Sequence, residues 1–145
     1  LDQWFRDEIG QDYPEIRTAI SSLLQVEAEL QEIVQLVGSD ALPVDQQLTL
    51  EVARMIREYF LQQNGFHEVD AFCSVDLHYK MAKAILTFQE SAKSAMAAGA
   101  DLQDVVNVPA RTELMRGRFE STYSEEIDGL VEKMNKEIAA AIEEN

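Results

Sequence analysis

The sequence predicts an all-α fold, a helical bundle of four long helices with short connecting helices. Apolar residues recur three and four positions apart through several long stretches, which is the period of one helix face. Glycine and proline number only 6 and 3 of 145 residues, so few positions interrupt a helix. No stretch alternates between apolar and polar residues for long, and we therefore expect no strand.

The first long helix is expected to begin at Pro14 and to end at Gly38. Proline is tolerated in the first turn of a helix, and glycine can form a left-handed cap at its end. The apolar stripe between them is spaced 4, 3, 4, 3 and 4, which predicts a face packed on the bundle: Ala19, Leu23, Val26, Leu30, Ile33 and Val37. Glu27, Glu29 and Glu32 are expected to form a solvated face, and residues 38–43 a loop.

The second long helix is predicted over residues 45–63, with Asn64-Gly65 as its break. The third is predicted to start near Ser74, as an N-cap, and to close at Gly99. The inner face of the second should be Leu48, Val52, Met55, Ile56, Tyr59 and Phe60. That of the third should be Met81, Ile85, Phe88, Ala92 and Ala95.

Two short helices and a fourth long one complete the prediction. The short helices are expected at residues 101–106 and 109–117, the second opened by Pro109. Ser124 is expected to cap the last helix, whose inward residues are Ile127, Leu130, Met134, Ile138 and Ala141.

Charge and composition exclude several classes of protein. The formal net charge is −15, which argues against binding to nucleic acid or to anionic membrane surfaces. A single cysteine excludes an internal disulfide framework. No apolar run approaches the roughly 18 residues that a membrane span needs. The chain starts at Leu1 without a signal-peptide pattern, and we expect it to be a piece of a longer protein.

The densest polar cluster lies between the second and third helices and includes His67, Asp70, Cys73 and His78. It lacks the spacing of known zinc sites, and one thiol cannot form a structural site without recruiting carboxylates. The alternative is an interhelix turn whose carboxylates cap the next helix. We expect no metal site, and with no phosphate-binding glycine motif in the sequence we expect no catalytic residue.

A resemblance changes the interpretation of residues 29–70. The phrases LQEIVQLVG, DALP, LEVARMIREYFLQQN and FHEVD closely resemble the C-terminal part of the catalytic A subunit of archaeal A-type and V-type ATP synthases. The similarity continues more loosely through YKMAKAIL and the Val108-Pro109-Ala-Arg segment. The layout is also similar to that of the beta subunit of F-type ATP synthases.

The resemblance implies a helical domain without its catalytic machinery. In that family a central domain carries the phosphate-binding loop, its lysine and the catalytic glutamate. Residues 1–13 would then be a linker from a missing nucleotide-binding domain, and residues 14–145 the C-terminal helical domain. The parent enzyme would couple ATP synthesis or hydrolysis to proton or sodium translocation, using ATP or ADP and Mg. The fragment would hold no cofactor and would be inactive alone.

Two sites follow from the resemblance. The aromatic after the Gln-Gln-Asn run stacks on the adenine of bound nucleotide in the family, and here it is Phe66; the alternative is a turn residue packed on the bundle. The loop between the first two long helices faces the rotating central stalk, which assigns that role to Ser39, Asp40, Ala41, Leu42 and Pro43. The alternative for this loop is an ordinary helix–helix turn.

The implied partners are the neighbouring A and B subunits and the central stalk, at a cytoplasmic location peripheral to the membrane and without direct insertion. Trp4 and Phe5 are expected to serve a domain interface, since large aromatics before the first helix more often do that than lie in a loop. The competing hypothesis is a free-standing acidic helical adaptor that binds partner helices. An adaptor would have no reason to carry the ATP synthase phrases.

Overall fold

The structure, a computed structural model, describes residues 1–66, 71–117 and 124–143, with side chains for 1–59, 77–117 and 125–143. The long helices are α2 (Tyr13–Val37), α3 (Val44–Phe66), α4 (Ala71–Ala97) and α7 (Ser124–Glu143). The short elements are α1 (Asp2–Glu8), the 3-10 helix η1 (Ser39–Ala41), α5 (Leu102–Val106) and α6 (Pro109–Arg116). No strand occurs in these ranges, so the all-α bundle of four long helices is confirmed.

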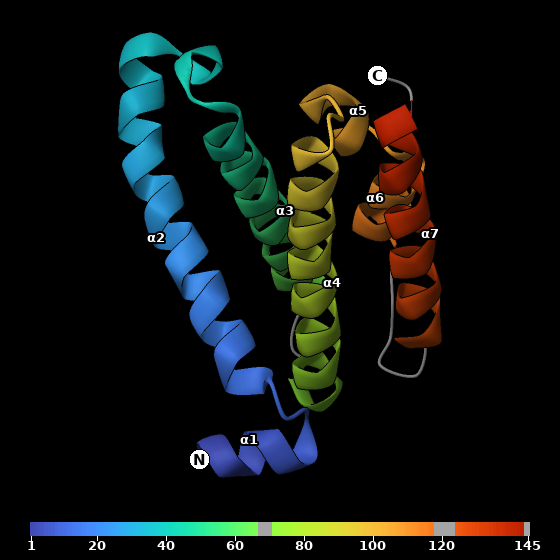
Figure 1. The fold of residues 1–145 in the computed structure, drawn as a ribbon. Coiled ribbons are helices and arrows are strands. Elements are labelled where there is room, and N and C mark those ends of the chain that lie inside the picture. Colours follow the sequence, from blue (N-terminus) through green and yellow to red (C-terminus); the bar gives the residue numbers. More distant parts are fainter. Residues whose placement is uncertain (67–70, 118–123, 144–145) are drawn as a thin grey trace.

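The long helices lie in a row, in the order α2, α3, α4 and α7 (Figure 1). The short α6 packs on α7, and α1 lies across the end of the bundle where α2 begins. The centre of the core sits between α3, α4, α6 and α7. Its largest fully buried side chains are Leu48, Met55, Ile56, Met81, Ile85, Phe88, Leu114, Ile127, Met134 and Ile138.

Most expected inner faces are confirmed. All five expected residues of α4 are buried, as are those of α7 except the partly buried Leu130. The inner face of α3 is buried from Leu48 to Tyr59, and the side chain of Phe60 lies outside the described residues. Gly38 and Gly99 follow the ends of α2 and α4 with φ of +86° and +108°, a region that favours glycine.

Two expected helix boundaries are wrong. The helix α3 does not break at Asn64-Gly65 but continues to Phe66, and α4 begins at Ala71, so Ser74 lies inside the helix and is not its N-cap. A glycine in a helix costs only about 1 kcal/mol relative to alanine, which the packing of a long apolar face outweighs. Serine is likewise a preference at a helix start and does not force one.

Only two of the six residues in the expected stripe of α2 are buried. Leu23 and Leu30 are buried, but Val26, Ile33 and Val37 are 43%, 44% and 61% exposed, and Ala19 is also exposed. The reason is the place of α2 at the edge of the row, where neighbouring helices cover only part of its surface. The residues expected as a linker, 1–13, include the helix α1, which the sequence reasoning missed.

Candidate functional site

The tip of the α2–α3 hairpin is a tight turn. Its centre is η1, and Leu42 is the one residue of the loop's Ser39–Pro43 run that is buried. The side chain of Gln47 donates a hydrogen bond from Nε2 to the Leu42 carbonyl at 2.9 Å. The backbone N–H groups of Gln46 and Gln47 donate to the Pro43 carbonyl, each at 3.0 Å. The loop is therefore held from inside by Leu42 and presents the rest of its residues outward.

Large exposed apolar side chains flank this loop in the sequence. Leu36, Val37 and Val44 are 85%, 61% and 50% exposed, and Ile33 is 44% exposed. Ile33, Leu36 and Val37 share one face of α2 because they are three and four positions apart. We call these four residues the apolar tip. Clustered exposed apolar residues mark contact surfaces more often than scattered ones do.

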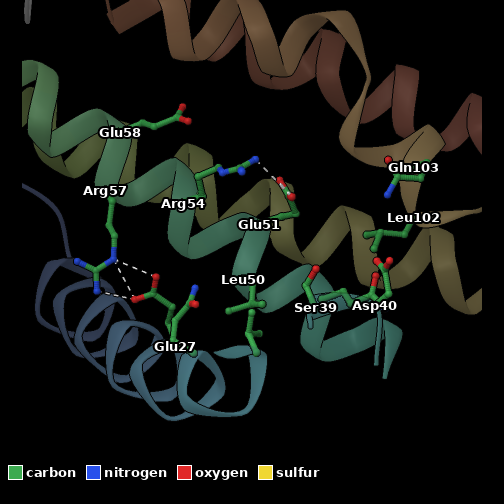
Figure 2. Close-up of a pocket in the computed structure, with 13 residues that line it drawn as sticks. Glu27, Ser39, Asp40, Leu50, Glu51, Arg54, Arg57, Glu58, Leu102 and Gln103 are labelled. Carbon is green, nitrogen blue, oxygen red and sulfur yellow. Dashed lines mark hydrogen bonds and ion pairs between the residues drawn. The ribbon is translucent and has the colours of Figure 1, made fainter. Parts of the chain in front are cut away.

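An ion pair joins α2 to α3 farther along the two helices (Figure 2). Arg57 donates from Nε to both carboxylate oxygens of Glu27, at 2.9 and 3.0 Å, and from Nη2 to Oε1 at 2.5 Å. Glu27 is only 7% exposed, so the expectation that it belongs to a solvated face is wrong, whereas Glu29 and Glu32 are exposed as expected. Glu27 lies four positions after Leu23 and three before Leu30, on the same helix face as these buried residues. This spacing is the sequence signal that could have identified Glu27 as buried.

The ion pair forms one wall of a polar cleft of about 460 Å³ between α2, η1, α3 and the start of α5. Ser39 and Asp40 line the end of the cleft formed by the loop, and Arg54 and Glu58 of α3 line its side (Figure 2). Charges of both signs face this cleft.

Another polar network fixes α3 to the core. Arg111 of α6 donates to Glu51 of α3 at 3.0 Å and to the Val106 carbonyl at 3.1 Å. Its guanidinium also lies 5.6 Å from the ring centroid of Phe88 on α4. Arg54 approaches the same Glu51 at 3.6 Å. Arg111 was not singled out from the sequence, because its partners come from three other segments of the chain.

The two predicted sites lie at opposite ends of α3. The loop precedes Val44, and Phe66 is the last residue of the helix. At about 1.5 Å per residue, the 23 residues of α3 place these ends about 34 Å apart. The side chain of Phe66 is outside the described residues, so its contact with adenine stays a prediction.

The predicted polar cluster at residues 67–78 lies almost wholly outside the described side chains. His78 is described: it is half-buried, its ring meets that of Tyr59 edge-on at 5.3 Å, and burial lowers its pKa. Among the residues that the structure describes, no group of three or more His, Cys, Asp or Glu is placed to hold a metal ion. None of the described helices is both long and apolar enough to cross a bilayer.

Comparison with known proteins agrees with the resemblance of residues 29–70. Residues 2–108 match the model of a family described as the C-terminal domain of V and A type ATP synthase.

Several relatives are the A subunits of A-type ATP synthases from archaea. The chain is 44% identical to that of Methanosarcina barkeri over 140 residues, which are 97% of this chain and 24% of the relative. It is 48% identical to that of Natronomonas pharaonis over 130 residues, 90% and 22% of the two chains. It is 47% identical to the A subunit of Haloquadratum walsbyi over 132 residues, which are 91% of this chain and 23% of the relative. The chain thus spans about a quarter of the length of these relatives, and it belongs to the family of C-terminal domains of V- and A-type ATP synthases.

Proposed function

We propose that this domain transmits movement between a nucleotide site and the central stalk of a rotary ATP synthase, as part of the catalytic A subunit. The observation that carries the proposal is the position of α3. This one helix joins the predicted adenine-contacting residue, Phe66, to the loop predicted to face the stalk. Ion pairs tie it to α2 and to α6, so a push at one end moves the whole helix and its neighbours.

The contact with the central stalk is assigned to residues 38–43 together with the apolar tip. Within the loop Asp40 is the single acidic residue, followed by Asp45 at the start of α3. Leu36, Val37 and Val44 are large apolar side chains that are 85%, 61% and 50% exposed. We therefore infer a contact that depends on shape and apolar burial rather than on an electrostatic grip.

Phe66 would supply one wall of the adenine pocket. A flat ring stacked on a base contributes about 1–3 kcal/mol. The end of α3 that carries Phe66 points toward the end of the bundle where α1 lies, away from the tip (Figure 1). A nucleotide-binding domain that preceded Leu1 would meet the bundle at this end, and would hold the phosphates and Mg.

The parent enzyme would synthesise or hydrolyse ATP and translocate protons or sodium ions. Its A and B subunits and the central stalk would be the partners of this domain, on the cytoplasmic side and peripheral to the membrane. The free-standing adaptor is disfavoured because the family match covers residues 2–108 and the relatives are ATP synthase subunits. The chain alone should neither bind ATP tightly nor turn it over, since it carries 15 net negative charges and no phosphate-binding motif.

The adenine contact is tested by Phe66→Ala in the full-length protein, assembled into the complex. Nucleotide affinity should fall about 5- to 150-fold, the equivalent of 1–3 kcal/mol. Phe66→Tyr keeps the stacking face and should have a mild effect. Unchanged affinity in the alanine variant would remove Phe66 from the nucleotide site.

The contact with the stalk is tested separately with Leu36→Asp. A charge at the apolar tip should lower the ratio of ions translocated to ATP hydrolysed in the reconstituted complex. Val26→Asp is the matched control, since Val26 is also exposed on α2 but lies about 15 Å from Leu36 along the helix. Equal coupling in the wild type and Leu36→Asp would contradict the assignment of the tip.

A further inference from the structure

The N-terminal helix α1 is joined to the bundle by a series of aromatic rings. Phe5 of α1 stacks on Tyr13 of α2, with ring centroids 4.6 Å apart and planes at 13°. Trp4 meets the edge of Phe5 at 5.0 Å. Tyr13 in turn lies 6.0 Å from the ring of Tyr79 on α4. Aromatic pairs at these separations contribute beyond their buried area, so the series links α1 and α2 to a helix that is far away in sequence.

A charged network closes the same junction. The buried Tyr79 donates from its hydroxyl to Oδ1 of Asp12 at 2.5 Å, and Lys83 approaches Oδ2 of that carboxylate at 3.1 Å. Asp12 lies in the turn between α1 and α2, at the N-cap position of α2. Hydrogen bonds to a carboxylate are stronger than those between neutral groups. The turn is thus held directly by two side chains of α4.

Gly10 permits this close approach. A Cβ added to it would lie 2.5 Å from the Tyr79 hydroxyl oxygen and 2.6 Å from the adjoining ring carbon, closer than real side chains pack. The φ of Gly10 is not in the left-handed region, so the need for glycine here is one of space. On the other side of the turn, Arg6 pairs with Glu15 and donates to the Gln11 carbonyl.

Helix α1 depends on these contacts for its order. It has seven residues, none of them buried, and isolated helices shorter than about 12 residues are marginal in water. From this geometry we infer that residues 2–13 are a fixed extension of the bundle and not a flexible linker. Asp12, Tyr79 and the space at Gly10 form the latch that holds them.

One consequence rests on the proposed function. If a nucleotide-binding domain precedes this chain, the pivot between the two domains lies on the N-terminal side of Asp2. A rotation of the bundle would then carry α1, with its 55% exposed Trp4, as a rigid arm. The inference about the latch itself needs neither nucleotide nor stalk, so it can fail or succeed independently.

Amide hydrogen exchange on the 145-residue chain tests the latch. The N–H groups of Phe5, Ile9 and Gly10 donate to the carbonyls of Leu1 and Phe5, and they should be protected in the wild type. Gly10→Ala should force Tyr79 away and speed exchange at Phe5 and Ile9 at least about tenfold, which corresponds to about 1.4 kcal/mol of opening free energy. Tyr79→Phe, which removes only the hydroxyl, should speed it less.

Gly129→Ala is the matched control. Gly129 lies within α7 with no atom near its added Cβ, so alanine should leave α1 exchange unchanged. Rapid exchange of the α1 amides in the wild type would overturn the inference. So would wild-type protection in both Gly10→Ala and Tyr79→Phe. If Gly10→Ala does not fold, Tyr79→Phe decides by itself. Protection of the α1 amides in that variant at the wild-type level would then overturn the inference.

Discussion

Helices on the two sides of the row carry the same kind of apolar stripe, but the stripe is buried on α4 and α7 and largely exposed on α2. On α4 and α7, Phe88 and Met134 are fully buried, and Ile85 and Ile138 are 1% exposed. On α2, Ile33 and Val37 stand at comparable spacing but are 44% and 61% exposed. Helix α4 is packed between α3 and α7, and α7 at its own edge of the row packs on both α4 and α6, whereas α2 at the opposite edge packs mainly on α3. An apolar stripe therefore stabilises one region and leaves exposed apolar residues in the other.

The two regions also hold their helices together differently. The α4–α7 side relies on apolar burial, which is roughly proportional to the area removed from water. The α2 side has few buried side chains and adds the Glu27–Arg57 pair, which depends on two partners keeping their geometry. Helix α2 should therefore be more easily displaced than the α3–α4–α7 side, which would suit the proposed contact with the stalk.

The largest effect is expected from Ile85→Ala on the packed side. Removing a fully buried isoleucine should lower the free energy of unfolding by about 2–5 kcal/mol, because the lost transfer energy adds to the cavity left behind. Chemical denaturation measures this value. A loss below about 1 kcal/mol would mean that the α3–α4–α7 side is not the main source of stability.

A smaller effect is expected from Arg57→Leu on the α2 side. It leaves the buried Glu27 carboxylate without its donor and should cost about 1–3 kcal/mol. Arg54→Leu is the control. Arg54 is 65% exposed and its distance of 3.6 Å from Glu51 is long for an ion pair, so the cost of this change should stay below about 1 kcal/mol. Equal losses in the two variants would contradict a specific tie between α2 and α3.

The double variant Glu27→Leu with Arg57→Leu sharpens this point. Glu27→Leu removes the buried carboxylate that Arg57→Leu leaves without its donor, so the double variant should recover most of the stability lost in Arg57→Leu. A double-mutant cycle by denaturation gives the coupling energy. Strictly additive losses would show that the pair contributes nothing as a pair.

The junction at α1 predicts a pH dependence. The hydroxyl of Tyr79, and then Lys83, hold the pKa of Asp12 below its ordinary value, against the opposing effect of partial burial. A carboxyl whose pKa is lower folded than unfolded adds stability above the unfolded value, near pH 4, and loses it as the pH falls through the folded value. The wild type should therefore lose stability more steeply below about pH 4 than Asp12→Asn or Tyr79→Phe. Parallel curves from acid titrations of stability would contradict this.

The smallest effect on stability is expected from Ile33→Ala, the counterpart of Ile85→Ala on the exposed edge. Its side chain is 44% exposed, so the change should stay within about 0.5 kcal/mol in the isolated chain. The same denaturation measurement compares the two isoleucines directly. A loss above about 2 kcal/mol would place Ile33 in the core and remove it from the apolar tip.

The sequence alone predicted the helices from local signals. The 3.6-residue period indicated the long helices and most of their inner faces, and Gly38 and Gly99 located two of their ends correctly. It failed at Asn64-Gly65 and Ser74, where tertiary packing outweighs a weak local preference. It also missed α1, because seven residues with no buried side chain carry no periodic pattern to recognise.

By itself the sequence determined the class of the fold, the core of α3, α4 and α7, and the family, because periodicity and long specific phrases are properties of neighbouring residues. Only the tertiary structure decided which stripe stays exposed, that Glu27 is buried against Arg57, and that Asp12 and Tyr79 fix α1 to the bundle. The last two contacts join residues 30 and 67 positions apart. Such pairs depend on how helices are arranged around one another, which the local pattern of any one helix does not contain.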